Sequence, residues 1–352
     1  MVEVPPLGDN LLYAAAALVP LILSGCLYVF ARRRRSAKVP AGWRQIILGN
    51  GLVVLLLLSI VFLIGENYYR FVYDATDSFS QTRTSQQWFE RHFQYNNAQV
   101  RDSVDYVFNH RSNRPRFTFI GDSFTAGHGI ADVESRFTNN IRNAKRGEWE
   151  IHTFADVGRD TGEEIKLIPS LLQYRYDFDR VVLIYCLNDT NDIVPQQEKI
   201  AERGSQSDHR PGFLVEHSFL INTYYFRLKA RFDPDVSQYY DFVRTAYDGP
   251  TWEQQQERLR RFRDSCHDAG GRLSVVIFPF MHSLGPDNSC KPAHEKIFQF
   301  WREIEVPCLD LLPTFEQHAG ENLTVNRYDA HPNEHAHAIA ADAIRKFLEN
   351  QL

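Results

Sequence analysis

Ser123 lies where an apolar segment meets a helical pattern, a position in which a side-chain hydroxyl can do chemistry. The residues RFTFI at 116–120 are typical of a strand and lead directly into GDSFTAG at 121–127. A sharp strand-to-helix turn exposes a serine hydroxyl, and a flanking glycine such as Gly121 permits the tight backbone. A serine hydroxyl is a weak nucleophile unless a base lies beside it. A serine that only caps a helix would give the same local pattern, so the remaining groups decide the interpretation.

Three further segments follow the ends of predicted elements. Gly158 lies in ADVGRDTGEE after the second predicted strand, Asn188 and Asp189 follow the third, and DAHPN at 329–333 precedes the last helix. Together with GDSFTAG, these segments resemble the four blocks of the SGNH/GDSL hydrolase superfamily, named for a Ser, a Gly, an Asn and a His. They occur in the order of that family, and the resemblance spans residues 115–350. The joint match is specific, although no single block would be.

The resemblance implies a role for each of these residues. Ser123 would be the nucleophile, His331 its base, and Asp329 the acid that orients the imidazole and stabilises its charged form. Acyl transfer also develops a negative oxygen, which needs preorganised hydrogen-bond donors. The family pattern assigns these donors to the backbone N–H groups of Ser123 and Gly158 and to the side-chain amide of Asn188.

The chain departs from the commoner family pattern at two places. Cys186 stands two residues before Asn188, where the family often has glycine, and we expect a narrower pocket there. The acid commonly sits three residues before the histidine, but that position is Tyr328, and Asp329 is only two before His331. Asp329 is therefore the triad position that most needs a structural test.

Neighbouring polar residues are given structural roles. We expect Asp122 to brace the turn through its carboxylate, and Asn191 and Asp192 to be loop residues near the entrance of the site. His335 and His337 follow on a predicted helix and are expected to be surface or packing residues, since the HPN context favours His331.

The elements around these residues alternate between strand and helix. The predicted strands cover 116–120, 149–154, 180–187, 272–278 and 306–311, and the predicted helices cover 135–143, 162–172, 251–269, 293–303 and 334–349. The continuous apolar run at 180–187 is typical of a strand buried on both faces. This alternation predicts an α/β fold: a three-layer α/β/α, flavodoxin-like domain with a five-stranded parallel sheet. Sites in such sheets lie beyond the carboxyl ends of the strands, where the blocks above fall.

Two segments lie outside this alternation. Residues 66–115 form a polar connector, in which we expect helical pieces and the packing anchors Trp88, Phe89 and Phe93. The catalytic domain is predicted over 116–352, with an aromatic-rich insertion at 195–250. A long insertion at this place serves as a lid or substrate-binding element, or as a structural cap or oligomer contact, and the sequence leaves these alternatives open.

The first 65 residues predict a two-helix membrane anchor. Leu11–Ala31 and Ile46–Gly65 are apolar runs free of charge, of about the 20-residue length that crosses a bilayer. The loop between them carries only basic charges: Arg32, Arg33, Arg34, Arg35, Lys38 and Arg44. Basic loops stay in the cytoplasm, so we expect the catalytic domain on the periplasmic or extracytoplasmic side of the inner membrane. Tyr68, Tyr69, Phe71 and Tyr73 then suit an aromatic belt.

The cysteine pattern permits disulfides without choosing among them. Cys26 lies in the first apolar run, and four cysteines lie further on, at 186, 266, 290 and 308. Four cysteines allow three full pairings, and the apolar strand pattern around Cys186 favours a buried thiol.

Three functions remain open after these observations. The first is an ester hydrolase that removes O-acyl groups, acetyl among them, from an extracytoplasmic glycan or lipid. The second is an O-acyltransferase that modifies a cell-surface or exported polysaccharide with the same site. The third is a non-catalytic, membrane-tethered binding module. No cofactor is expected, no ligand spacing suggests a metal site, and the net charge of −5 argues against a nucleic-acid partner.

Overall fold

The computed structural model describes residues 7–37, 40–109, 113–194, 212–234, 238–285 and 288–352. The chain divides into two compact units. The first comprises Met1–Ala75, Gln81–Gln87 and Asp208–Arg231, and the second comprises Thr76–Ser80, Trp88–Ser207 and Phe232–Leu352. The predicted connector therefore contributes residues to both units.

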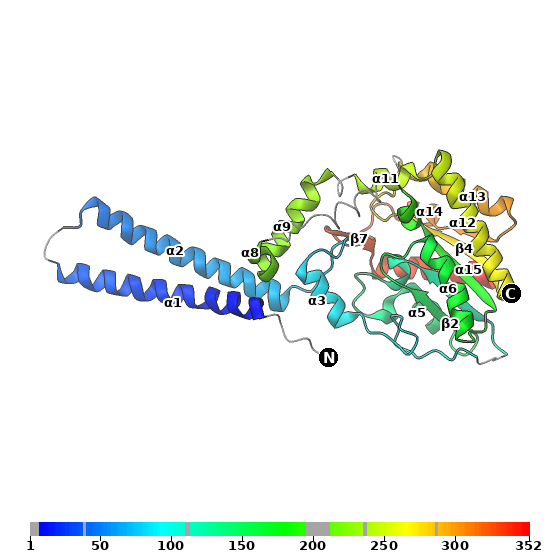
Figure 1. Ribbon diagram of the computed structural model, residues 1–352, viewed down its shortest axis with the longest axis horizontal. Coiled ribbons are helices and arrows are strands. Elements are labelled where there is room, and N and C mark those ends of the chain that lie inside the picture. Colours follow the sequence, from blue (N-terminus) through cyan, green and yellow to red (C-terminus); the bar gives the residue numbers. More distant parts are fainter. Residues whose placement is uncertain (1–6, 38–39, 110–112, 195–211, 235–237, 286–287) are drawn as a thin grey trace. The chain divides into compact units, whose positions relative to one another are not determined.

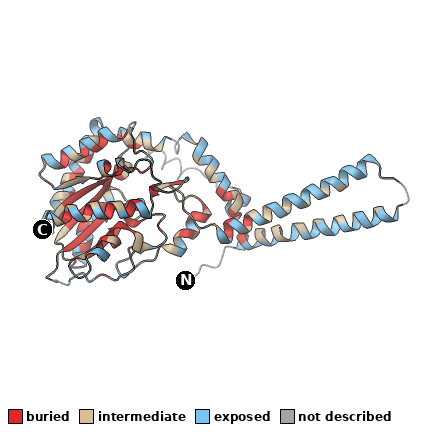
Figure 2. Cartoon of the chain, turned by 180° about the vertical axis from the view of Figure 1, so that it is seen from behind, coloured by how far each residue is buried: buried red, intermediate tan, exposed pale blue. Residues whose placement is uncertain are grey.

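The first unit is built on two long apolar helices, α1 (Leu7–Ser36) and α2 (Trp43–Asn67). Helix α2 continues into a π-helical turn at Tyr68–Val72. Their most apolar windows have a mean hydropathy of 2.1 and 2.8 and are 6% and 0% buried. Figure 2 shows both helices exposed along most of their length. Within the described residues, these are the two helices long and apolar enough to cross a membrane, and they contain both predicted runs.

The same unit holds part of the aromatic insertion. Helix α8 (Phe213–His217) and helix α9 (Phe219–Phe232), which ends at the unit boundary, follow one another along the chain. Residues 195–211 of the insertion lie outside the described residues.

The second unit contains a parallel five-stranded sheet in the order β2-β1-β3-β4-β5. Figure 1 labels β2 and β4 of this sheet. Its strands are β1 (Arg116–Gly121), β2 (Glu150–Ala155), β3 (Arg180–Cys186), β4 (Arg272–Phe278) and β5 (Cys308–Asp310). Every residue of β1 is buried, as are all residues of β3 after Arg180. The α/β class and the five-stranded parallel sheet predicted from the sequence are confirmed.

Helices cover both faces of the sheet. They are α5 (Phe137–Ala144), α6 (Thr161–Gln173), α12 (Gly249–Asp268), α13 (Lys291–Glu303) and α15 (Glu334–Glu349). Connections between parallel strands are right-handed. From β1 the chain moves to β2 at one edge of the sheet, and from β2 it returns past β1 to β3, so the direction of movement across the sheet reverses. This reversal puts α5 on one face, where it packs with α15, and α6 on the other, where it packs with α12. The layers are therefore α/β/α, as predicted.

Shorter elements complete the second unit. They are α4 (Ser123–Ala126), the 3-10 turns at Val133–Ser135 and Leu187–Ile193, α11 (Tyr239–Thr245) and α14 (Leu312–Glu316). Helix α3 (Arg83–His92) provides the helical piece expected in the connector, and its Trp88 is buried together with Phe93, as anticipated. A two-stranded antiparallel sheet, β6 (Thr324–Asn326) with β7 (Asp329–Pro332), was not expected from the sequence.

Candidate active site

Ser123 is the first residue of the short helix α4, directly beyond the end of β1. The Asp122 carboxylate accepts a hydrogen bond from the backbone N–H of Phe124 at 2.9 Å and so caps this helix, the bracing role expected for it. A Cβ atom on Gly121 would clash with the Thr125 hydroxyl and come within 2.9 Å of the Ile184 carbonyl oxygen. Glycine is required at this position because the turn leaves no room for a side chain.

The Ser123 hydroxyl meets a histidine from the far end of the chain. Its Oγ lies 2.8 Å from Nε2 of His331, and Nδ1 of the same ring lies 2.6 Å from the Asp329 carboxylate. A carboxylate only accepts hydrogen bonds, so Nδ1 carries the proton and Nε2 offers its lone pair to the serine O–H. The three residues proposed from the sequence are therefore brought together in the order that proton transfer requires.

Strand β7 explains why a spacing of two residues is sufficient. Side chains at positions i and i+2 of a strand point to the same side, and both Asp329 and His331 lie on β7. The Asp329 carboxylate also accepts the backbone N–H of His331 at 3.1 Å, which fixes the acid against the residue that it orients.

The Asp329 carboxylate is buried and satisfied by several donors. Besides His331, it accepts hydrogen bonds from the Thr76 hydroxyl and from Nε2 of His128, which lies 3.3 Å away. Burial acts to raise the pKa of Asp329, but the adjacent charge of His331 and the hydrogen bonds from both histidines outweigh it. They hold the pKa well below its usual value. The acid thus stays ionised while enclosed by protein.

His128 lies directly behind the catalytic-type imidazole. The rings of His128 and His331 are stacked, with centroids 4.0 Å apart and an interplanar angle of 9°. The Trp88 ring is also nearly parallel to His128, at 16° with centroids 6.4 Å apart. Nε2 of His128 faces two acceptors, the Asp329 carboxylate and the Asp77 carbonyl oxygen at 3.2 Å, so it carries the ring proton. Burial and the charge of His331 lower the pKa of His128, which keeps this second histidine neutral.

The oxyanion-hole candidates lie around the same opening. Gly158, in the loop between β2 and α6, has a φ of +80°, and a Cβ atom there would meet nothing within 4 Å. This left-handed backbone favours glycine, although the surrounding space would admit a side chain. The Asn188 amide, just past β3, donates one N–H to Asp122 at 3.0 Å. Its second N–H remains for a ligand.

These groups border one cavity of about 290 Å³ in the second unit. Its lining combines Ser123, Gly158, Asn188 and His331 with apolar rings and small polar groups from other segments: Ser78, Phe79, Ser80, Phe124, Val157, Asn191, Tyr239, Tyr240, Phe280 and Ala330. Tyr239 and Tyr240 belong to the end of the aromatic insertion. That part of the insertion therefore forms a wall of the cavity.

Other residues singled out in the sequence bond to partners outside the Ser123–His331–Asp329 row. His335 pairs with Glu321 at the surface, and His337 is buried, where its Nδ1 accepts the backbone N–H of Phe137. Asn191 lines the cavity and donates to the Tyr239 hydroxyl at 2.8 Å, whereas Asp192 forms an ion pair with Arg258.

All five cysteines lie in the described part of the chain and are free thiols. Cys186 is fully buried, as its strand pattern indicated. Burial raises the pKa of its thiol well above the usual value, so it remains protonated beside the site.

His128, Asp329 and His331 also place possible metal-ligand atoms close together, within 4.8 Å of one another. Binding one ion would require the lone pairs of both imidazoles to converge on a point. The two rings are instead parallel. Both nitrogens of His331 and Nε2 of His128 face Ser123, Asp329 or Asp77, and only Nδ1 of His128 has no hydrogen-bond partner among the described residues. The arrangement fits a hydrogen-bonded relay better than a metal site.

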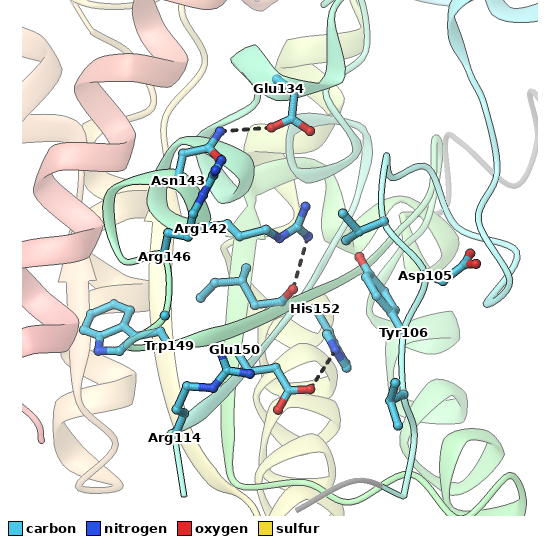
Figure 3. Close-up of a pocket in the computed structure, with 14 residues that line it drawn as sticks. Asp105, Tyr106, Arg114, Glu134, Arg142, Asn143, Arg146, Trp149, Glu150 and His152 are labelled. Carbon is cyan, nitrogen blue, oxygen red and sulfur yellow. Dashed lines mark hydrogen bonds and ion pairs between the residues drawn. The ribbon is translucent and has the colours of Figure 1, made fainter. Parts of the chain in front are cut away.

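A second hollow of about 480 Å³ lies at the start of β2, at the opposite end of that strand from Gly158. Figure 3 shows that its polar groups are largely engaged with one another: Asn143 donates to Glu134, and His152 lies beside Glu150. Arg142 is held by the buried Asp102. This hollow therefore resembles a surface depression between paired side chains more than a second reactive site.

The contributions of Thr76, Ser78 and His128 were not anticipated. Thr76 and Ser78 come from the polar connector, and Ser78 Oγ accepts the backbone N–H of Ala330 at 2.8 Å. Their partners lie more than 250 positions further along the chain, a separation that leaves no local pattern. His128 follows the serine block closely, and a histidine in the segment GHG was the one signal that could have drawn attention to it.

Comparison with known proteins gives structural likeness without sequence matches. No family model matches the chain, and no curated protein matches it. Among solved structures, TesA is similar at 13% identity with a TM-score of 0.43, over 67% of this chain and 99% of that one. A lipolytic protein of the G-D-S-L family from Veillonella parvula is similar at 11% identity with a TM-score of 0.41, over 66% and 96% of the two chains.

A catalytic mutant of an acetylxylan esterase from Geobacillus stearothermophilus is similar at 12% identity with a TM-score of 0.39, over 68% of this chain and 96% of that one.

Proposed function

We propose that the protein is a serine-dependent ester hydrolase of the SGNH/GDSL type. The observation that carries the proposal is the row of hydrogen bonds from Ser123 through His331 to Asp329, with the serine hydroxyl facing a cavity. An ordinary helix-capping serine would need neither a buried imidazole at 2.8 Å nor an ionised acid behind that imidazole.

In the proposed reaction, His331 removes the proton of Ser123 as Oγ attacks the acyl carbon of the ester. The N–H groups of Ser123, Gly158 and Asn188 stabilise the negative oxygen of the tetrahedral intermediate. His331 then gives the proton to the departing alcohol, and an acyl-enzyme remains. Water, deprotonated by the same histidine, releases the acid and restores the serine.

The substrate that we propose is an O-acylated carbohydrate or lipid on the outer side of the inner membrane. The cavity volume of about 290 Å³ is at the lower end for ligand pockets, which supports a short acyl group such as acetyl. The basic loop between the two apolar helices supports a location outside the cytoplasm.

A second candidate is acyl transfer to a sugar hydroxyl, and the aromatic wall favours it. Phe79, Tyr239, Tyr240 and Phe280 border the cavity and would limit the access of water to an acyl-enzyme. The same residues would also provide flat surfaces for a sugar ring. Hydrolysis and transfer share every step as far as the acyl-enzyme.

The first prediction tests this proposal with the full-length protein in detergent. p-Nitrophenyl acetate, butyrate and octanoate are offered with and without a sugar acceptor, and free acid and acylated sugar are measured separately. We expect cleavage of the acetyl ester and release of acetic acid that does not depend on the acceptor. Acylated sugar as the main product would favour transfer instead.

Variants of the site separate an enzyme from a binding module. Ser123→Ala and His331→Ala should each reduce turnover by roughly 10⁴-fold or more, and the double variant should be little worse, because the two act as a unit. His335→Gln changes an exposed histidine and should leave activity near that of the unmodified protein. Equal activity in Ser123→Ala and the unmodified chain would exclude a serine mechanism.

A further inference from the structure

Helix α9, which belongs to the first unit up to Arg231, carries an exposed apolar stripe. Ile221, Tyr224, Tyr225, Leu228 and Phe232 recur every three to four residues, a spacing that places them on one face of a helix. Tyr224, Tyr225 and Leu228 are 52%, 41% and 56% exposed. The first turns of α9 are buried on other sides, at Phe219, Asn222 and Thr223, which are 6%, 4% and 0% exposed. The stripe is therefore an apolar surface that the rest of the first unit leaves uncovered.

Two basic residues border this stripe. Lys229 and Arg231 lie one on each side of the line from Tyr225 to Phe232. The neighbouring α8 adds Phe213 and Leu214, each 53% exposed. An apolar stripe of aromatic and aliphatic residues with flanking cations is the composition of helices that lie in a membrane interface.

The start of α9 is fixed to the end of α2. The Glu66 carboxylate, near the last residue of α2, accepts hydrogen bonds from the Ser218 hydroxyl at 2.7 Å and from the backbone N–H groups of Phe219 and Leu220 at 3.1 and 3.0 Å. Leu220 packs on Gly65, where a Cβ atom would come within 3.0 Å of it. Arg70 completes the contact as a buried partner of Glu66 at 2.7 Å.

The start of α1 is attached to the same segment. Asp9 is buried, accepts from Arg83 at 2.8 Å and lies 2.7 Å from Nδ1 of His217, the last residue of α8. Phe219 contacts two cations, with the Arg70 and Arg83 guanidinium groups 4.8 and 4.7 Å from its ring centroid. Helices α8 and α9 are thus attached where both apolar helices end on the side away from the basic loop.

We propose that α8 and α9 form a third membrane contact, which lies in the outer interface of the bilayer and binds lipid through the stripe Ile221, Tyr224, Tyr225, Leu228 and Phe232. The proposal depends on the two apolar helices crossing the bilayer, and it is independent of the reaction at Ser123. If α1 and α2 span the hydrocarbon, their joined ends lie at its boundary. Because the stripe begins at this boundary, lipid is already next to it and can cover it, and no further protein is needed. Lys229 and Arg231 would then reach the lipid phosphates.

The second prediction measures the depth of this stripe. The full-length protein carrying Leu228→Cys in a Cys26→Ala background is labelled with an environment-sensitive fluorophore. It is then reconstituted into vesicles of phosphatidylcholine and phosphatidylglycerol. Lipids with a spin-labelled quencher in the headgroup region or deep in the acyl chain report the depth of the label. Gln254→Cys, an exposed position on α12 in the second unit, is the matched control.

We expect headgroup-region quencher to reduce the emission at position 228 at least about twofold more than at position 254, with a blue-shifted spectrum at 228. The proposal would be overturned if neither quencher lipid reduces the emission at position 228 more than at position 254. It would also be overturned if the label at position 228 remains shielded in detergent without lipid. The latter result would indicate a second copy of the chain or another protein on this face. Because the readout is fluorescence, a failure here leaves the esterase assay unaffected.

Discussion

At the scale of single residues, Asp329 is the most informative member of the site. It departs from the commoner family spacing, yet it reaches His331 because both side chains stand on one side of β7. Its other oxygen is held by Thr76 and His128. The buried acid can remain ionised only because these donors replace water around it, so the neighbours of Asp329 matter to the reaction as much as the spacing does.

The third prediction concerns His128 as a positioning residue. His128→Leu removes a donor from the Asp329 carboxylate, and the pKa of Asp329 should rise because the loss favours the protonated acid. A hydrogen bond to a charged group is worth about 1.5–3 kcal/mol, so kcat should fall about tenfold or more. The acid limb of the pH–rate profile should move to higher pH, with KM little changed, since His128 does not line the cavity.

His128→Gln supplies the control, because its amide N–H can still donate to the carboxylate. The positioning role would be supported if His128→Gln keeps the pH–rate profile of the unmodified protein and only His128→Leu shifts the acid limb. Equal impairment of the two variants without any shift of the acid limb would mean that His128 only fills space between Trp88 and His331.

At the scale of elements, local patterns explain what the sequence could predict. The strands β1, β3 and β4 are short segments rich in apolar residues that alternate with helical patterns along the chain, so their type and their parallel arrangement could be predicted without knowledge of distant contacts. β7 was missed because four residues between turns carry no periodic signal. The sequence also did not predict that Ser78 and Tyr239 line the same cavity, and here the reason is different. Ser78 belongs to the connector and Tyr239 to the insertion, and only the folded chain brings those segments to one cavity.

Helix α6 contains a buried acidic residue that the sequence did not predict and that affects the stability of the fold. Its Glu164 is fully buried, and within the described residues neither carboxylate oxygen has a hydrogen-bond partner. Burial, reinforced by the charge of Asp122, raises the pKa of Glu164 from 4.5 to about 8. The folded chain therefore keeps a proton here that the unfolded chain loses above about pH 4.5.

The fourth prediction follows from that difference. Stability should fall as pH rises from about 4.5 to about 8, since the unfolded state binds fewer protons throughout this window. Each pKa unit corresponds to about 1.4 kcal/mol, so the effect of Glu164 is on the order of a few kcal/mol. Glu164→Gln, which cannot ionise, should be more stable than the unmodified protein at pH 8 and should flatten the slope. Thermal unfolding at pH 5, 6.5 and 8 in detergent measures both.

The exposed neighbour Glu163 provides the comparison for Glu164. Glu163→Gln leaves the buried carboxyl in place and should retain the slope of the unmodified protein. An unchanged slope in Glu164→Gln would mean that another group takes up the proton in the folded state.

At the scale of the whole molecule, we expect the distribution of charge along the chain to determine on which side of a membrane each part lies. Helices α1 and α2 expose apolar side chains along most of their length, which water would disfavour and lipid would accept. At the start of α1 and the end of α2, the charged residues form ion pairs, Asp9 with Arg83 and Glu66 with Arg70. The other ends lead into the basic loop, where the net positive charge opposes transfer across the bilayer.

The fifth prediction concerns this orientation. A reporter that is active only in the cytoplasm should be inactive when fused after Leu352 and active when fused after Arg35, at the end of the first apolar helix. Replacing Arg32, Arg33, Arg34 and Arg35 with glutamine should weaken the preference and produce some activity from the Leu352 fusion, because the bias depends on basic residues close to the helix ends. Full activity after Leu352 in the unmodified chain would place the serine site inside the cytoplasm. The proposed extracytoplasmic substrate would then be wrong, whatever the outcome of the esterase assay.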